Sequence, residues 1–258
     1  MPAPRNRFKQ ALNDGKTVFG CWLGLADTFS AELMGTTGFD WLVIDGEHAP
    51  NDLRSITAQL QVLEASPSHP VVRVPVGETY LIKQILDAGA QTILVPMVDN
   101  ADQARQLVRD VTYPPLGDRG VGYALTRAAR FSQIADYGTT ADAEICLLVQ
   151  VESVKGLENL DDILEIDGID GVFIGPADLA ADMGHMGDLL HPDVQHAIMA
   201  ALAKIAAAGK APGILSTHDP MTKDAINAGA RFVAVGADSL ILSHAAQALA
   251  AKWKATRA

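Results

Sequence analysis

The chain contains 258 residues, of which 48% are hydrophobic and 20% are charged. This length and composition fit one α/β domain, which we expect to cover residues 1–258. The formal net charge of −11 argues against a nucleic acid or an anionic membrane as a partner. No apolar run approaches the roughly 18 residues of a membrane span, and the N-terminus lacks the apolar core of a secretion signal. We therefore expect a cytoplasmic protein.

Short apolar runs along the chain predict eight strands, at residues 18–24, 41–45, 70–74, 92–96, 145–151, 171–174, 212–215 and 231–235. Amphipathic segments predict helices at 28–36, 51–64, 79–88, 100–110, 153–165, 176–183, 192–209, 219–228 and 237–253. Strands that are apolar throughout and alternate with helices indicate a parallel sheet buried on both faces. Eight such units in about 250 residues predict a TIM barrel. A doubly wound open sheet is the alternative, but no glycine-rich nucleotide-binding loop follows a strand.

Smaller features add detail to this fold. Gly89, Gly209 and Gly229 each separate a helical pattern from a strand, as glycines that end helices do. Cys21 and Cys146 lie in apolar runs, which favours reduced core thiols over a disulfide. Residues 112–144 hold only weak helical patterns, and connections of this length are usually functional or mobile. Contact with a ligand or another subunit and a plain surface excursion both remain open for this segment.

Side chains able to do chemistry gather where the predicted strands end, which is where a barrel carries its catalytic groups. They are Trp22, Asp45, Glu47, His48, Arg73, Gln150, Glu152, Asp178, Ser216, Thr217 and His218. Alternation along a strand places Gln150 and Glu152 on one face, pointing into the mouth. A carboxylate there needs a cation or hydrogen-bond donors, because its desolvation is costly. A structural ion pair with Arg73 would also satisfy it.

The stretch GPAD at residues 175–178 predicts a turn from a strand into a helix, whose first N–H groups can bind an anion. Asp178 is either an ordinary first-turn acid, favoured by the helix dipole, or a metal ligand. Because its strand lies next to that of Glu152, the two carboxylates would suit Mg²⁺ or Mn²⁺.

Arg73 interrupts an apolar run and needs a partner. It either pairs with Asp45 or Glu152 as scaffold, or stabilises negative charge that develops on an oxygen. A metal, an anion cradle, an arginine and His48 together describe enolate chemistry on a 2-keto acid.

Several longer stretches resemble a known family. They are FDWLVIDGEHAP (39–50), PVVR (70–73), QTILVPMV (91–98), YPPLGDRGVG (113–122), LVQVE (148–152), GIDGVFIGPADLAADMG (168–184), GKAPGIL (209–215) and FVAVG (232–236). Over nearly its whole length the chain is similar to metal-dependent (class II) pyruvate aldolases of the 4-hydroxy-2-oxoheptanedioate, or hydroxyketoacid, aldolase type. Citrate-lyase-like enzymes share the broad plan, but DGEHAP and PVVR favour the aldolase branch.

The resemblance implies roles for individual residues. The implied metal ligands are Glu152 and Asp178, with Mg²⁺ or Mn²⁺ as the ion and Co²⁺ as a further candidate. The implied substrate-binding groups are Gln150, Gly175, Ala177 and Asp178. Arg73 matches the arginine on the enolate oxygen and His48 the catalytic histidine. Asp45 and Glu47 match its neighbours, which hold metal-bound water. Trp22 and Leu215 either shape the pocket or are plain core residues.

Asp87 matches an acid that orients the catalytic histidine. It ends the predicted helix 79–88, which runs antiparallel to its strand, so it lies at the opposite end of its own barrel. Either Asp87 serves a histidine of another subunit, or it is a solvated helix-end acid. The resembling family forms hexamers with active sites at subunit interfaces, which favours the first reading. By the same argument, residues 117–124 reach the active site of a neighbouring subunit, where Val121 contacts the aldehyde half of the substrate.

The expected function is reversible cleavage of a 4-hydroxy-2-oxo acid into pyruvate, or a close 2-keto acid, and an aldehyde, through a metal-stabilised enolate. The resemblance adds a place in aromatic catabolism. A Schiff-base lyase is the rival enzyme, but it needs a lysine at a strand end; only Lys155 lies close to the mouth. A non-catalytic keto-acid-binding barrel would not need the base His48. The remaining histidines considered are expected to be surface or capping residues: His185, His191, His218 and His244.

Overall fold

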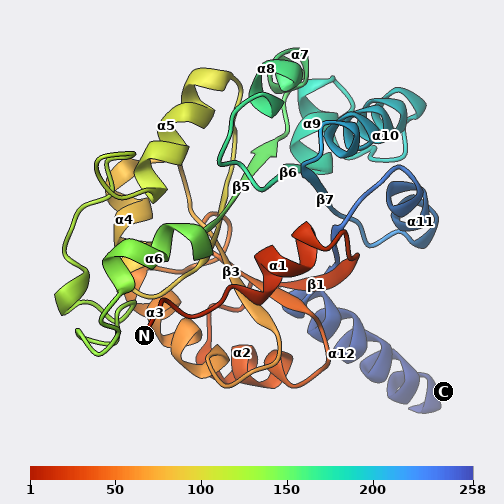
Figure 1. Cartoon of the computed structure of the whole chain (residues 1–258). Helices are drawn as coiled ribbons and strands as arrows, with labels where there is room; N and C mark the ends of the chain where they lie inside the picture. Colours follow the sequence, from red (N-terminus) through yellow and green to blue (C-terminus); the bar gives the residue numbers. More distant parts are fainter. Residues whose placement is uncertain (258) are drawn as a thin grey trace.

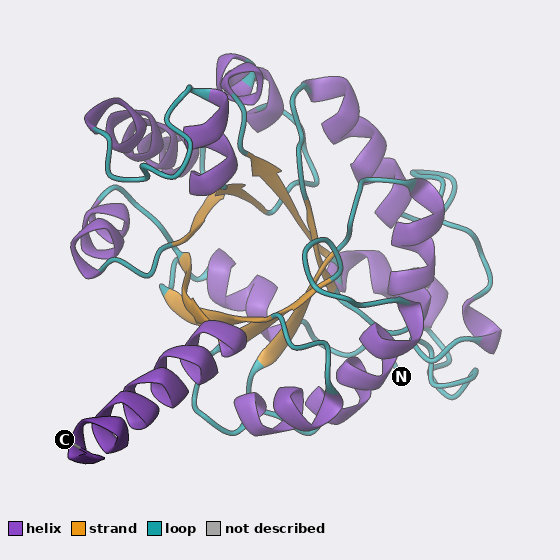
Figure 2. Ribbon diagram, turned by 180° about the vertical axis from the view of Figure 1, so that it is seen from behind, coloured by secondary structure: helices purple, strands orange, loops and turns teal. Residues whose placement is uncertain are grey.

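The computed structural model describes residues 1–257 and contains a closed barrel of eight parallel strands in sequence order (Figures 1 and 2). The strands are β1 (Val18–Leu23), β2 (Trp41–Asp45), β3 (His69–Arg73), β4 (Thr92–Val95), β5 (Cys146–Val151), β6 (Gly171–Ile174), β7 (Ala211–Leu215) and β8 (Phe232–Ala237). The barrel closes because β1 pairs with β8, Val18 lying opposite Phe232. The predicted TIM barrel is confirmed, and the open doubly wound sheet is wrong.

Helices surround the barrel. They are α1 (Arg7–Asn13), α2 (Thr28–Gly35), α3 (Leu53–Leu63), α4 (Thr79–Asp87), α5 (Ala101–Val111), α6 (Tyr137–Glu144), α7 (Val154–Glu158), α8 (Leu160–Leu164), α9 (Pro176–Asp182), α10 (Pro192–Ala207), α11 (Asp219–Asn227) and α12 (Asp238–Lys254), with short 3₁₀ turns at Tyr123–Leu125 and Ala255–Arg257. The helix predicted at 153–165 is two short helices, α7 and α8, which meet at Asn159.

The core has two layers, which the alternation of side chains along each strand separates. Cys146 and Leu148 of β5 point into the barrel and pack with the aromatic rings of Trp41 and Phe232. Their neighbours Leu147, Val149 and Val151 face outward and pack against the helices. The predicted inward face of β5 is therefore confirmed. Cys21 and Cys146 are both buried and free, as expected.

Two helices were not predicted, and both are held by tertiary contacts. In α1, Phe8 and Leu12 join the inner aromatic cluster, so this helix lies across the end of the barrel where the strands begin (Figure 1). In α6, Tyr137 and Ala141 join a small separate cluster with Ala129. These helices of seven and eight residues are too short to be stable without such packing.

The helix ends follow the sequence closely. Gly89, Gly209 and Gly229 have φ values of 105°, 78° and 112°, the left-handed conformation predicted for them. His191 and His218 cap α10 and α11, because their side chains accept backbone N–H groups of Asp193 and Met221. Surface or capping positions were expected for these histidines.

The last helix, α12, projects away from the barrel and carries the C-terminus with it (Figures 1 and 2). Its first residue, Asp238, is buried and accepts the N–H groups of Gly24, at 2.7 Å, and Leu25, at 3.4 Å. Beyond it the helix exposes five large apolar side chains, Leu240, Ile241, Leu242, Leu249 and Trp253. Within residues 1–257, no helix combines the length and the apolar character required to cross a membrane.

Candidate active site

The turn after β2 is organised by Asp45. Its Oδ1 accepts the backbone N–H groups of Glu47, at 3.0 Å, and His48, at 3.3 Å. Arg73 donates to the same carboxylate through Nε, at 2.9 Å, and through Nη2, at 2.7 Å. Burial disfavours the charged form of Asp45, but the hydrogen bonds and charge of Arg73 outweigh it and lower the pKa. Of the two partners considered for Arg73, Asp45 is the one it pairs with.

Arg73 is buried and held on several sides. Besides Asp45 it contacts Glu47, with 2.8 Å between Nη1 and Oε2, and its guanidinium lies 5.4 Å from the centre of the Trp22 ring. Trp22 thus supports the arginine from inside the barrel. Burial raises the pKa of Glu47, although the charges of Arg73 and His48 oppose the shift.

His48 reaches outward from this turn. Its side chain is 67% exposed, and Nε2 lies 3.9 Å from Oε2 of Glu47. The ring is accessible to a substrate that enters the mouth, and Glu47 is close enough to influence it. The turn around Asp45 determines where the His48 backbone sits, while among residues 1–257 only Glu47 lies close to the ring as a charged partner.

Glu152 follows β5 and is buried at the mouth. Oε1 accepts the N–H of Met97, at 2.9 Å, and Oε2 accepts the side-chain amide of Gln150, at 2.9 Å. Burial raises the pKa of Glu152 to about 7, and the neighbouring charges of Asp178 and Glu47 push it in the same direction. Four carboxylates, those of Asp45, Glu47, Glu152 and Asp178, surround one arginine and leave this region with excess negative charge.

Gly175 caps α9 and lets Glu152 lie against the backbone. A Cβ at position 175 would stand 2.1 Å from Oε2 of Glu152 and 2.8 Å from its Cβ. The φ of Gly175 is −88°, so contact, not backbone conformation, requires glycine here. No side chain caps α9, and its first N–H groups are therefore available to an anion. Ala177 and Asp178 are exposed on this first turn.

The donor set at the mouth fits a divalent cation. Oε1 of Gln150 is buried without a hydrogen-bond partner in the described chain, and the carboxylates of Glu152 and Asp178 carry more charge than Arg73 balances. Oxygen ligands of this kind suit Mg²⁺ or Mn²⁺. Leu215, at the end of β7, is partly buried against the inner core, which is compatible with both roles considered for it.

Asp87 lies away from these groups. It ends α4 at the end of the barrel where strands begin, so one chain does not bring it to His48. Its Oδ1 lies 3.6 Å from Nη2 of Arg119, a fully buried arginine whose guanidinium stacks 4.4 Å from the centre of the Tyr113 ring. Burial raises the pKa of Asp87, and Arg119 opposes the shift.

Arg119 and Met97 were not anticipated as neighbours of site residues. Arg119 occurs in the glycine-rich stretch 117–124, but its burial depends on Tyr113 and Tyr137, which no spacing rule connects to it. Met97 serves Glu152 through its backbone N–H and adopts a φ of 54°. A cavity of about 810 Å³ opens at the far end of the barrel, beside α1, and none of the predicted site residues lines it.

Comparison with known proteins identifies the family. A family model described as HpcH/HpaI aldolase/citrate lyase matches residues 18–245. The chain belongs to the HpcH/HpaI aldolase family. The resemblance inferred from the sequence motifs is thereby confirmed, and the chain is an aldolase, a carbon–carbon lyase, so the non-catalytic barrel considered as an alternative is wrong.

Individual members of the HpcH/HpaI family are similar over nearly their full lengths. A hydroxypyruvate/pyruvate aldolase of Roseobacter denitrificans is 58% identical over 98% of this chain and 99% of its own length. A 4-hydroxy-2-oxo-heptane-1,7-dioate aldolase of Salmonella dublin is 53% identical over 98% of this chain and 96% of its own. The crystal structure of a family protein from Burkholderia cenocepacia superposes with a TM-score of 0.91 at 42% identity, covering 98% of this chain and 100% of that one.

Proposed function

We propose that this aldolase reversibly cleaves 4-hydroxy-2-oxo acids into pyruvate, or a close 2-keto acid such as hydroxypyruvate, and an aldehyde, with Mg²⁺ or Mn²⁺ as cofactor. The observation that carries the proposal is the buried Glu152 carboxylate, held against Gly175 and close enough to Asp178 for their charges to interact. Similar proteins named for hydroxypyruvate and pyruvate, and for a heptanedioate, support a 2-keto acid as the common half of the substrate.

In this mechanism, different residues would hold the metal and the substrate. A divalent metal held by Glu152 and Asp178 would supply Lewis acidity to the keto acid. The free N–H groups at the start of α9, around Ala177, bind the substrate carboxylate. Gln150 contributes the unpartnered oxygen of its amide to the same region.

Arg73 stabilises the negative charge that develops on the keto oxygen as the enolate forms. Three of its five N–H groups are taken by Asp45 and Glu47, which leaves two for the substrate. Since these partners and Trp22 hold the guanidinium in place, little reorganisation accompanies the reaction.

His48 removes the proton from C3 of the keto acid and returns it in the cleavage direction. Its exposed ring at the mouth suits this role, and a positioned general base contributes typically about 10²–10⁴ in rate. Glu47, 3.9 Å from its Nε2, stabilises the ring once it is protonated.

Exchange of the methyl protons of pyruvate in deuterated water tests the proposal. Treatment with EDTA should abolish exchange, and Mg²⁺ or Mn²⁺ added back singly should restore it. His48→Ala should lower both exchange and aldol cleavage by at least about 100-fold. A rate within twofold of wild type in both assays would remove His48 from the mechanism.

The Schiff-base mechanism predicts the opposite result, namely inactivation by borohydride with pyruvate and no effect of EDTA. Its candidate nucleophile, Lys155, is poorly placed. The side chain is 65% exposed and lies 3.9 Å from the carboxylate of Asp99. A Schiff-base lysine is normally activated by desolvation or a neighbouring cation, and Lys155 has an acid beside it.

The same proposal includes a homo-oligomer, a hexamer, with active sites at subunit interfaces. The large apolar residues along α12, including Leu249 and Trp253, are exposed in the single chain, and apolar surface of this kind normally becomes buried in an interface. Asp87 would then serve His48 of the partner subunit. Sedimentation at micromolar concentration measures the assembly directly.

A further inference from the structure

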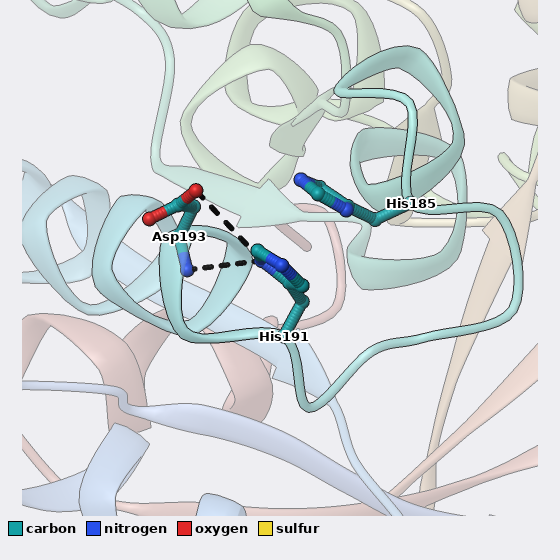
Figure 3. A group of neighbouring side chains, drawn as sticks. All are labelled: His185, His191 and Asp193. Atoms are coloured by element: carbon teal, nitrogen blue, oxygen red, sulfur yellow. Dashed lines mark hydrogen bonds and ion pairs between the residues drawn. The ribbon is translucent and has the colours of Figure 1, made fainter.

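The connection between α9 and α10 brings three potential metal ligands together, at a place separate from the acids of the mouth. They are His185, in the turn after α9, and His191 and Asp193, at the start of α10 (Figure 3). One ligand atom from each lies within 4.8 Å of the other two. The turn is tightened by Gly184 and Gly187, whose φ values of 84° and 80° few other residues adopt.

These side chains have few competing partners. The rings of His185 and His191 lie face to face, with centres 3.6 Å apart and planes inclined by 17°. Nδ1 of His191 accepts the N–H of Asp193 at 3.3 Å, a long hydrogen bond, and lies 3.8 Å from Oδ2 of the same residue. The Asp193 side chain is 75% exposed and free to turn. Capping alone explains His191, but it does not explain why His185 stacks on it.

We propose that His185, His191 and Asp193 bind a borderline transition-metal ion, Zn²⁺ in the first place, with water completing the shell. Two imidazoles and one carboxylate are a common zinc ligand set, whereas Mg²⁺ and Mn²⁺ prefer carboxylate, carbonyl and water oxygens. The chain therefore offers two sites of different chemistry, an oxygen site at the mouth and a nitrogen-rich site on the α9–α10 connection.

The geometry needs only small side-chain movements to reach coordination. Zinc bonds of 2.0–2.1 Å place tetrahedral ligand atoms about 3.4 Å apart, and Nδ1 of His191 is already 3.8 Å from Oδ2 of Asp193. The stacked rings must tilt towards a common point, which rotation of partly exposed side chains allows. Coordination at Nδ1 replaces the long hydrogen bond from Asp193.

Asp193 has a second effect, through charge. The site lies at the N-terminal end of α10, a helix of 16 residues, where the helix dipole disfavours a cation. The carboxylate of Asp193, in the first turn, offsets this and reduces the charge of the bound ion. Asp193→Asn should therefore weaken binding at least as much as loss of either histidine, although an amide oxygen occupies the same place.

Binding at this site would fasten the end of α9 to the start of α10. The other end of α9 begins at Gly175, whose N–H donates to the carbonyl of Val151 at 3.3 Å, and its last residue, Asp182, accepts the N–H of Val154 at 2.7 Å. The ion would therefore act as a clip that immobilises residues 183–193.

Equilibrium dialysis of the full-length chain against ⁶⁵Zn²⁺, with and without excess Mg²⁺, tests the proposal. Wild type should bind two Zn²⁺ per chain without Mg²⁺ and retain one when Mg²⁺ occupies the mouth. His191→Asn keeps a side chain that can cap α10. With Mg²⁺ present it should retain no Zn²⁺ at concentrations where wild type retains one, because the Kd of this site is at least tenfold higher. His185→Gln and Asp193→Asn should likewise lose this Zn²⁺. The matched control is His196→Gln, because His196 is an exposed histidine of α10 outside the proposed site.

The mouth site is removed independently in Glu152→Gln/Asp178→Asn, where one Zn²⁺ should remain. Hydrogen exchange of residues 183–193 should slow when Zn²⁺ binds wild type or His196→Gln, and stay unchanged in His191→Asn. Equal Zn²⁺ affinity in His191→Asn and His196→Gln, or no ion bound beyond the mouth, would overturn the proposal. Neither outcome bears on the aldolase mechanism, since the two sites share no residue.

Discussion

Gly175→Ala places the proposed site under a defined strain. The new Cβ would stand 2.1 Å from Oε2 of Glu152, where ordinary contact begins at 3.4 Å, so the carboxylate must retreat by about 1.3 Å. Since the φ of Gly175 is −88°, alanine adopts this backbone without cost. The new methyl group therefore displaces the side chain of Glu152, because its closest contacts are all with that residue.

That retreat separates Glu152 from the two donors that hold it, the N–H of Met97 and the amide of Gln150, each 2.9 Å away. Overpacking of this kind costs about 1–3 kcal/mol of stability, and a displacement of about 1 Å at a reacting centre lowers the rate by about 10². We expect a folded protein with Mg²⁺ affinity reduced at least tenfold and kcat/KM reduced by about 100-fold.

Isothermal titration with Mg²⁺ and the pyruvate proton-exchange rate measure these effects. Gly236→Ala is the matched control, because it also lies near the end of a strand and a Cβ there meets nothing closer than 3.6 Å. If Gly175→Ala matches Gly236→Ala in metal affinity and in rate, Glu152 is not the ligand that the proposal makes it.

Four further changes have distinct expected outcomes. Arg73→Lys loses the two-point pairing with Asp45 and should lower the proton-exchange rate at least 100-fold; a loss below threefold would contradict its role on the enolate. Burial raises the pKa of Glu152 to about 7, so below pH 7 protons compete with the metal and the Mg²⁺ Kd from titration calorimetry should rise; a constant Kd from pH 5 to 8 would argue otherwise. Burial lowers the pKa of His69 to about 4 from 6.5. The unfolded chain therefore takes up a proton first as pH falls from 6.5 to 4, and urea unfolding should show stability falling by about 1 kcal/mol per pH unit more than in His69→Gln; parallel curves would refute this. Trp253→Glu should dissociate the assembly in sedimentation, and an unchanged oligomer would show that α12 is not in the interface.

Secondary structure was predictable wherever one chain segment carries the whole signal. Each predicted strand agrees with the structure to within two residues at either end, because β-branched apolar runs between turn residues are local patterns. The inward face of Gln150 and Glu152 follows from alternation in the same way. Short α1 and α6 have no such pattern of their own and depend on Phe8 and Tyr137 finding partners far along the chain.

The candidate site was predictable as a set of residues but not as a set of pairs. Parallel topology brings strand ends together, which placed Asp45 and Arg73 at the mouth. The acid that pairs with Arg73 depends on side-chain geometry, which the sequence does not give. In the structure, Nη2 of Arg73 lies 2.7 Å from Oδ2 of Asp45. The burial of Arg119 against Tyr113 arises inside an irregular segment, where neither the alternation of a strand nor the periodicity of a helix applies.

The way α12 leaves the barrel has a mechanical consequence. Asp238, its first residue, is also the acceptor that holds Gly24 and Leu25, in the first loop of the mouth. The helix of 17 residues that begins with Asp238 therefore acts as a lever that pivots at this buried carboxylate. If α12 packs in the proposed subunit interface, a tilt of the helix would move Asp238 and, through its two hydrogen bonds, the loop after β1. Subunit packing would then change how the substrate fits at the mouth. Selection for tight packing and selection for a well-shaped entrance would then act on the same aspartate.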